Sequence, residues 1–378
     1  MEEITINGKI LKLPVYFPDA TRAVAKSLDT QDLLNVGVEG CVINTLHLAE
    51  KPGRSLIQEA GGVHKMMNWP GILASDSGGF QIYSLIQNDP AYGKMHRDGF
   101  IYYTGGVKKK KKNIFTPEKS IQTQFDLGAD IMVCLDYFTP EKADDAMIRL
   151  SVEKTTEWAR RCKQEFARHI NNLPAGKAGQ QLTINNRPVL LAVIQGGSSK
   201  TYREKSATEL INIGFDGYAF GGHWLDEEGK FDFDILSFTA SLMPKAAIKF
   251  GLGIGSPKAI IEGFKAGYRI FDCVLPTRDG RHGRLYNFTG DPDTMDILSI
   301  EKPTDFIAIE REKYARDFAP ISEYCDCLTC KNYSRAYLHH LFNIEDSTAG
   351  RLASIHNLRT YTKLMELLRK VPEVSQVP

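Results

Sequence analysis

Short apolar runs rich in β-branched and aromatic residues recur along the chain and alternate with longer amphipathic stretches. The apolar runs end in small or polar residues and cover positions 40–48, 71–80, 129–136, 189–197, 215–222, 247–255 and 268–276. Helical patterns lie between them, at 117–127, 146–170, 202–213, 234–243 and 258–266. Near-continuous apolar strands that alternate with helices indicate a parallel sheet covered on both faces. About eight such units in a chain of this length favour a (β/α)8 barrel over an open doubly wound sheet.

Other segments depart from this alternation. Residues 4–17 have the pattern of an N-terminal β-hairpin. Residues 171–187 are polar and rich in Gly, Asn and Gln, which indicates a loop or small hairpin between a helix and the next strand. Thr116, followed by Pro117 and Glu118, has the signature of a helix N-terminus.

The charge balance excludes a protein that is coated with nucleic acid over its whole surface. The 378 residues include 47 Lys and Arg against 46 Asp and Glu, a net charge of +1. Any contact with nucleic acid therefore needs a local basic patch. Lys108–Lys112 is a run of five lysines. A solvated loop is the usual role of such a run, and a contact to RNA phosphates is the alternative.

Composition also indicates a compartment. The opening residues carry no pattern of an export signal, and no apolar stretch is long enough to span a membrane. The odd number of cysteines, seven, fits reduced thiols and a metal site better than a disulfide framework. We therefore expect a cytoplasmic protein.

Candidate chemistry lies where the predicted strands end, because barrel enzymes place their active sites there. Asp272 is enclosed between Phe271 and Cys273, where an aspartate is costly without a role, and three arginines follow it. We take Asp272 as the candidate nucleophile. The other strand ends carry polar residues or glycines, namely Asn44, Asp76, Asp136, Gln195 and Gly221-Gly222. Each alone is more often a helix cap, but their joint occurrence on one rim indicates a site.

These residues predict a reaction at a sugar that carries a heterocyclic base. Two carboxylates suit substitution at a sugar carbon, one attacking and the other moving protons. The remaining aspartate and Gln195 have the donor and acceptor pattern that reads the edge of a guanine-like base. Phe80 and Tyr137 offer aromatic faces on which such a base can stack.

A separate cysteine-rich segment predicts a metal site. Cys325, Cys327, Cys330 and His356 have the spacing C-x-C-x2-C-x25-H. Three thiolates and one imidazole make a closed tetrahedral zinc site, which is structural because no position stays open for water. His339 and His340 are nearer in sequence, but we expect them to be surface or packing residues of a short helix.

We predict that the chain has three parts, one of which contains the metal site. Residues 1–300 form the barrel, 301–357 the zinc-binding subdomain, and 358–378 a C-terminal helical segment that closes the barrel. Asp346 and Ser347 are expected to begin the final helix, which carries His356 and runs to about Arg369.

Together these motifs resemble the tRNA-guanine transglycosylase family over nearly the whole chain, from about Pro14 to Leu368. The motifs that carry the resemblance are 75–81, 116–122, 193–197, 221–222, 271–278, and Cys325 through His356. The resemblance implies an irregular (β/α)8 barrel with a C-terminal zinc subdomain. It also implies exchange of the wobble guanine of a tRNA anticodon for a 7-deazaguanine, through a covalent aspartyl-ribosyl intermediate.

The resemblance assigns roles by position. Asp272 matches the nucleophile and Asp76 the general acid/base. The base-recognition set is matched by Asp136, Gln195 and Gly222, with Phe80 as the stacking aromatic and Leu252 as an apolar pocket wall. Arg278 and Arg281 match arginines that contact the anticodon. Members of the family are commonly homodimers, so a homodimer is implied as well.

Two departures from the bacterial family pattern concern the incoming base. Tyr137-Phe138 stands where Glu-Cys is usual, and His223-Trp224 where Leu-Ala is usual. Both are implied to lie near the substituent at the 7-position, so the sequence leaves the identity of the inserted base open. Two alternatives also stay open: a DNA-guanine transglycosylase of the same superfamily, and a non-catalytic tRNA-binding partner subunit.

Overall fold

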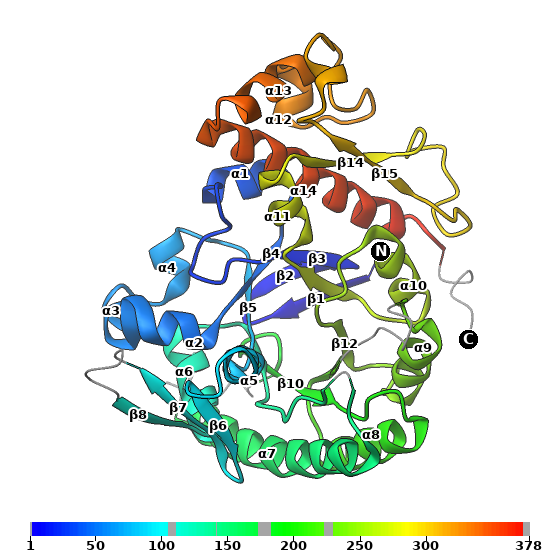
Figure 1. Cartoon of the computed structure of the whole chain (residues 1–378). Coiled ribbons are helices and arrows are strands. Elements are labelled where there is room, and N and C mark those ends of the chain that lie inside the picture. Colours follow the sequence, from blue (N-terminus) through cyan, green and yellow to red (C-terminus); the bar gives the residue numbers. More distant parts are fainter. Residues whose placement is uncertain (1, 105–110, 141, 173–182, 223–229, 373–378) are drawn as a thin grey trace. The chain divides into compact units, whose positions relative to one another are not determined.

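The computed structural model describes residues 2–104, 111–140, 142–172, 183–222 and 230–372 (Figure 1). Residues 108–110 of the lysine run, 173–182 of the polar segment and the pair at 223–224 therefore lie outside the described residues. None of the described helices combines the length and the apolar character needed to cross a bilayer.

Eight parallel strands form one sheet in the order β3-β13-β12-β11-β10-β9-β5-β4. Their bounds are β3 (Val15–Pro18), β4 (Gly40–Ile43), β5 (Ile72–Ser75), β9 (Ile131–Val133), β10 (Val189–Ile194), β11 (Gly217–Phe220), β12 (Ile248–Gly251) and β13 (Ile270–Cys273). A parallel bridge between Asp19 and Val42 links the ends of β3 and β4, so the sheet is a nearly closed barrel. The predicted (β/α)8 barrel is confirmed.

The remaining elements surround or extend this sheet. Helices are α1 (Thr30–Asn35), α2 (Thr45–Leu48), α3 (Arg54–Glu59), α4 (Val63–Met67), α5 (Gly79–Asn88), α6 (Pro117–Leu127), α7 (Asp145–Asn171), α8 (Lys200–Ile213), α9 (Phe233–Leu242), α10 (Pro257–Lys265), α11 (Leu275–Arg281), α12 (Leu328–Asn332), α13 (Arg335–Asn343) and α14 (Ser347–Arg369). Further strands are β1 (Glu2–Ile6), β2 (Lys9–Leu13), β6 (Gly93–His96), β7 (Gly99–Thr104), β8 (Lys111–Phe115), β14 (Arg284–Phe288) and β15 (Thr304–Ala308). A π-helical turn (Ala49–Gly53) and a 3-10 turn (Glu312–Tyr314) complete the set.

Local sequence signals account for most helix starts. The Thr116 hydroxyl accepts a hydrogen bond from the Lys119 amide, with Pro117 in the first turn of α6 as predicted. Ser256 caps α10 and Asp346 caps α14 in the same way. The final helix, which we expected to run from the Asp346-Ser347 cap to about Arg369, is therefore confirmed.

Two expectations from the sequence need correction. The stretch 4–17 is not only a hairpin, because Val15–Pro18 leaves the β1-β2 pair and becomes barrel strand β3, paired in parallel with β13. The apolar run 268–276 is not one strand, because β13 ends at Cys273 and Leu275–Arg281 forms α11. Pro276 lies in its first turn, where a missing amide hydrogen costs nothing.

The chain folds as two compact units. Unit 1 comprises residues 1–3, 11–42 and 251–378, and unit 2 comprises residues 4–10 and 43–250. In unit 1, β14, β15, α13 and α14 enclose a small apolar core of their own, which includes Leu285, Ile307 and Leu338 (Figure 1).

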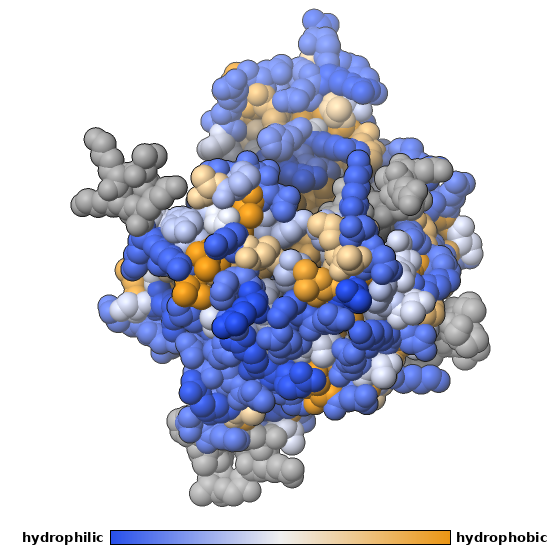
Figure 2. Space-filling view, turned by 60° about the horizontal axis from the view of Figure 1, so that its bottom comes forward, coloured by the Kyte–Doolittle hydropathy of each residue, from blue (hydrophilic) through white to orange (hydrophobic). Residues whose placement is uncertain are grey.

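On the face in Figure 2, hydrophilic residues predominate and hydrophobic residues form small patches. The three-part division predicted from the sequence stays a prediction.

Candidate active site and metal centre

Asp76 directly follows β5 in unit 2, and its carboxylate is fixed by several donors. The Asn44 side-chain amide donates to it at 2.6 Å. The backbone amides of Thr45 and Gly78 donate to the other carboxylate oxygen at 3.1 and 3.0 Å. Together these three hydrogen bonds fix the direction in which the Asp76 carboxylate points. Asn44 also caps α2 through its side-chain oxygen, so one residue performs the capping role and orients the carboxylate.

Phe80 stands in the first turn of α5, four residues after Asp76, and is 48% exposed. Its ring meets Phe138 edge-on with centroids 4.9 Å apart, and Phe138 also contacts Tyr83 at 5.2 Å. This aromatic cluster holds an exposed ring beside the Asp76 loop, which is the arrangement expected for a stacking surface.

Asp136 and Gln195 follow β9 and β10, and the structure brings them together. The Gln195 side-chain nitrogen donates to Asp136 at 2.7 Å, and its oxygen accepts from the Thr139 hydroxyl at 2.9 Å. Burial raises the pKa of Asp136 to about 6, and hydrogen bonds from Gln195 and Ser77 oppose that rise. Thr139 thus fixes which end of the Gln195 amide faces the carboxylate.

The glycine pair at the end of β11 lies against the same glutamine. A Cβ at Gly221 would come within 2.7 Å of the Gln195 nitrogen, and Gly222 has φ +89°. Only glycine fits both positions, so the backbone approaches Gln195 closely.

Asp272 lies on β13 in unit 1, at the end of the strand. Its carboxylate accepts from the Gly253 amide at 2.9 Å, and Gly253 takes φ +74° in the loop after β12. Leu252, half-buried, immediately precedes that amide. Burial raises the pKa of Asp272 to about 7, with the Gly253 hydrogen bond lowering it and the charge of Asp19 raising it.

Asp19 is a residue that the sequence interpretation missed. It follows β3, whose Phe17 is the register partner of Asp272. Because residues two apart on a strand share a face, Asp19 comes after Phe17 on the same face as Asp272, with Cα atoms roughly 8 Å apart. Its signal was present, since it is another aspartate at a strand end, but β3 had been assigned to a hairpin. Thr139 offered no comparable signal.

The two candidate RNA-contacting arginines lie on α11. Arg278 is exposed and lies 3.7 Å from the neighbouring Asp279. Arg281 is half-buried, and its Nη1 atom has no hydrogen-bond partner among the described residues. Burial and the like charge of Arg278 lower the pKa of Arg281, and Asp19 opposes this effect.

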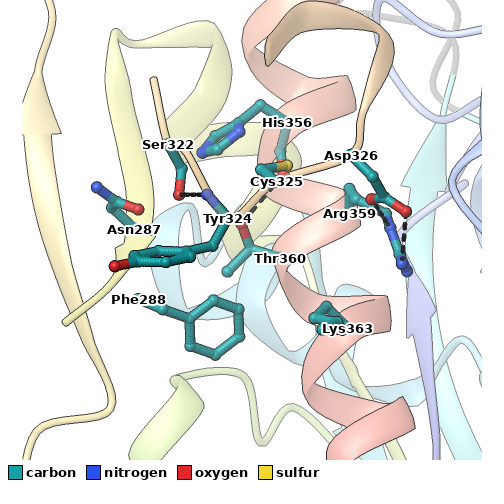
Figure 3. A pocket seen from close by; sticks show the side chains of 10 residues that line it. All are labelled: Asn287, Phe288, Ser322, Tyr324, Cys325, Asp326, His356, Arg359, Thr360 and Lys363. Carbon is teal, nitrogen blue, oxygen red and sulfur yellow. Dashed lines mark hydrogen bonds and ion pairs between the residues drawn. The ribbon is translucent and has the colours of Figure 1, made fainter. Parts of the chain in front are cut away.

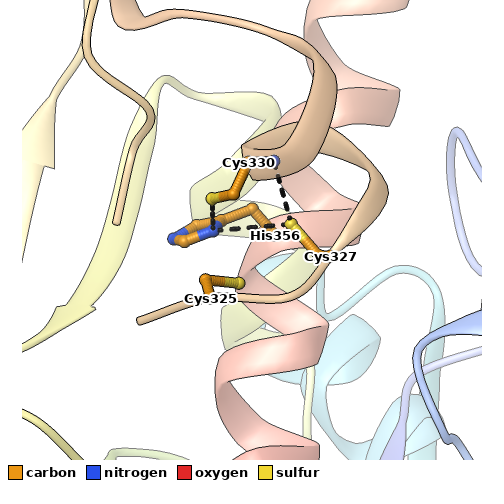
Figure 4. Close-up of side chains that lie close together, drawn as sticks. All are labelled: Cys325, Cys327, Cys330 and His356. Carbon is orange, nitrogen blue, oxygen red and sulfur yellow. Dashed lines mark hydrogen bonds between the residues drawn. The ribbon is translucent and has the colours of Figure 1, made fainter. Parts of the chain in front are cut away.

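The four predicted metal ligands converge in unit 1 (Figure 4). Their ligand atoms all lie within 4.8 Å of one another, and no other cluster of this kind occurs in the described part of the chain. His356 Nδ1 lies 3.3 Å from Cys330 Sγ and 3.9 Å from Cys327 Sγ. His356 Nε2 donates to the Tyr286 carbonyl at 2.6 Å, which leaves the Nδ1 lone pair facing the sulfurs. The donor set fits a tetrahedral zinc ion.

His339 and His340 lie outside this cluster. His339 is buried and contacts the Ile309 carbonyl and Asn343, whereas His340 is exposed, so the expected packing and surface roles are confirmed. A small pocket beside Cys325 is lined by Tyr324 and by residues of α14 (Figure 3). Its charged wall is already paired, because Arg359 binds Asp326, and Asp272 is not part of it.

Carboxylates that follow several strands of a parallel barrel are typical of (β/α)8 enzymes. The family model described as queuine tRNA-ribosyltransferase matches residues 1–371. The chain therefore belongs to this family of pentosyltransferases, and the resemblance drawn from its motifs is confirmed.

Several relatives match over most of their length. A queuine tRNA-ribosyltransferase of Halothermothrix orenii is 36% identical over 361 residues, covering 94% of this chain and 85% of that protein. Its counterpart in Caldanaerobacter subterraneus is 36% identical over 366 residues, covering 96% and 86%. The one in Staphylococcus epidermidis is 38% identical over 359 residues, covering 94% and 84%.

Proposed function

We propose that this protein is a tRNA-guanine transglycosylase that exchanges the wobble guanine of a tRNA anticodon for a 7-deazaguanine, a queuosine precursor. The observation that carries the proposal is the set of strand-end carboxylates, each held by backbone or side-chain donors, in a chain whose relatives are named queuine tRNA-ribosyltransferases.

In the proposed reaction, the Asp272 carboxylate attacks the anomeric carbon of the ribose. The bond from that carbon to guanine N9 breaks, and the base leaves with the electron pair while Asp76 supplies a proton. The incoming base then gives its N9 proton to Asp76 and attacks the same carbon, which releases Asp272. A raised pKa makes Asp272 a stronger nucleophile when ionised, and burial protects the ester from water.

Base recognition rests on Asp136 and Gln195 in this proposal. Because Thr139 holds the Gln195 oxygen, the amide nitrogen is the end that donates, and a base acceptor suits it. Asp136 accepts from the N–H groups of a guanine-like edge. Gly222 lets backbone groups approach the bound base, Leu252 supplies an apolar wall of the pocket, and the Phe80 ring stacks on the base. Phe138 faces Phe80, whereas His223-Trp224 lies outside the described residues.

The metal centre has a structural role in the proposal. Cys325, Cys327, Cys330 and His356 would hold zinc, which would cross-link the start of α12 and the residues just before it to α14. We also propose that the barrel, the zinc subdomain and the closing C-terminal segment follow the boundaries predicted above. Arg278 and Arg281 would contact the anticodon. The active form would be a homodimer, located in the cytoplasm because tRNA is available there.

Incorporation of labelled guanine tests the function. Wild-type protein should transfer the label into unmodified tRNA, Asp272→Asn should not, and Asp76→Asn should slow transfer by roughly two to four orders of magnitude. Duplex DNA serves as the parallel acceptor. Incorporation into DNA alone would assign the DNA-modifying alternative. Binding of tRNA without any incorporation would assign the partner-subunit alternative.

A further inference from the structure

The three-stranded sheet β6-β7-β8 follows α5 and precedes α6 in the sequence, and one of its faces packs against α7. Phe100 and Phe115 are register partners and are almost fully buried, and Phe100 packs edge-on against Trp158 at 5.6 Å. Because side chains alternate along a strand, the other face carries the residues one position away. The sheet therefore has an inner apolar side and an outer side.

The outer side carries exposed lysines at its edges. Lys94 pairs with Ile101, which pairs with Ile114, so these three share the outer face, where Ile101 is buried at the centre and Lys94 and Ile114 are exposed at the edges. Lys112 stands two residues before Ile114 and points the same way. Lys119 of α6 joins them, because its ammonium donates to the Ile114 carbonyl at 2.7 Å. We call Lys94, Lys112 and Lys119 the lysine face, and all three are exposed.

Acidic side chains near this sheet do not neutralise the lysine face. No ion pair joins its lysines to a carboxylate within the residues that the structure describes. Glu118 is instead bound by two guanidinium nitrogens of Arg161 at 2.7 and 2.8 Å, and Asp98 lies 3.5 Å from the same arginine. A chain with a net charge of only +1 thus keeps three positive charges together. Such a patch attracts a polyanion.

The sheet is anchored on the loop that carries Asp76 and Phe80. A Cβ at Gly78 of that loop would lie 3.1 Å from the Phe115 ring at the end of β8. The Ser120 hydroxyl of α6 donates to the Ser77 carbonyl at 2.7 Å. The elements that present the lysine face therefore pack directly on the loop where the reacting nucleotide is proposed to bind.

We propose that the lysine face binds phosphates of the acceptor RNA that lie outside the reacting nucleotide. The identity of the polyanion rests on the proposed function, whereas the position and sign of the surface do not. Lysines act here as point charges on the backbone, so they contribute affinity without reading sequence. Lys112 is the last residue of the lysine run, so this proposal assigns a role to the end of that run.

The test compares two triple variants of the full-length protein. Lys94→Gln/Lys112→Gln/Lys119→Gln removes the lysine face, and the control replaces exposed Lys65, Lys205 and Lys245 of the same unit by Gln. The dissociation constant for unmodified tRNA is measured by filter binding from 50 to 300 mM KCl. Each lost phosphate contact should reduce the magnitude of the slope of the logarithm of the association constant against the logarithm of the salt concentration by about 0.7–0.9.

We expect the lysine-face variant to lose about two units of slope and to bind tRNA about tenfold more weakly at 150 mM salt, with kcat and the KM for guanine unchanged. A triple Lys→Arg variant should retain the wild-type slope, which separates charge loss from misfolding. A slope equal to that of the control triple, with the fold intact by circular dichroism, would overturn the proposal. Absence of guanine incorporation by the wild type would instead count against the proposed function, because the binding slopes are measured independently.

Discussion

Replacing Asp272 by asparagine should stabilise the protein at alkaline pH while abolishing its activity. Burial raises the pKa of Asp272 from 3.8 to about 7, so the folded state retains a proton that the unfolded chain releases near pH 4. Stability from this group is complete below pH 4 and falls as pH rises through 7. A difference of about three units between the folded and unfolded pKa corresponds to a loss of about 4 kcal/mol of folding free energy at pH 8. Because the side chain is only half-buried, solvent screening lowers the expected effect to about 1–4 kcal/mol.

Urea unfolding of wild type and Asp272→Asn, measured between pH 4.5 and 8.5, provides the assay. Asparagine keeps an oxygen for the Gly253 amide, so the substitution removes the charge without removing the hydrogen bond. The stability difference should grow with pH and vanish towards pH 4. Asp305→Asn, at an exposed ion pair with Lys302, should change stability by less than about 0.5 kcal/mol at any pH. A destabilised Asp272→Asn at pH 8, or a difference independent of pH, would refute the reasoning.

Three further predictions concern Asp19, Thr139 and the metal centre. Asp19→Asn removes a like charge from Asp272, so the acid limb of the kcat/KM profile should move to lower pH by about 0.5–1 unit; an upward shift would contradict this. Thr139→Val frees the Gln195 oxygen and should raise the KM for guanine about tenfold with little change in kcat; an unchanged KM would remove Thr139 from base recognition. Cys330→Ser should lower bound zinc, measured by atomic absorption, and lower the unfolding temperature; full zinc content and a wild-type unfolding temperature would show that the zinc binds elsewhere.

The barrel was predictable because its strands are buried on both faces and form continuous apolar runs. β10 shows the effect most clearly, since all six of its residues, Val189–Ile194, are buried. β3 escaped for the opposite reason. It is short and follows directly on β2, with Pro14 between them, so its pattern merged with the hairpin. Only its pairing with β13 distinguishes it, and pairing is not a local property.

The metal ligands were predictable because their chemistry is carried by residue type and spacing. His356 was preferred over the nearer His339 and His340 although it is distant in sequence, and the cluster at α14 confirms the choice. Thr139 could not be found in this way. Its value comes from one hydrogen bond to Gln195, and threonines after a strand are too common to stand out. α11 was hidden by Pro276 and the glycines, which signal a break unless the proline falls in the first turn.

The central claim is that Asp272 becomes bonded to the ribose, and trapping that bond tests it most directly. Labelled tRNA is mixed with the protein without free guanine, quenched in acid, and separated under denaturing conditions, and the modified peptide is identified by mass spectrometry. The account predicts a protein–RNA adduct on Asp272 that disappears when guanine is added before the quench and is absent from Asp272→Asn. An adduct of equal yield in Asp272→Asn, or guanine exchange at the wild-type rate without any adduct, would contradict it.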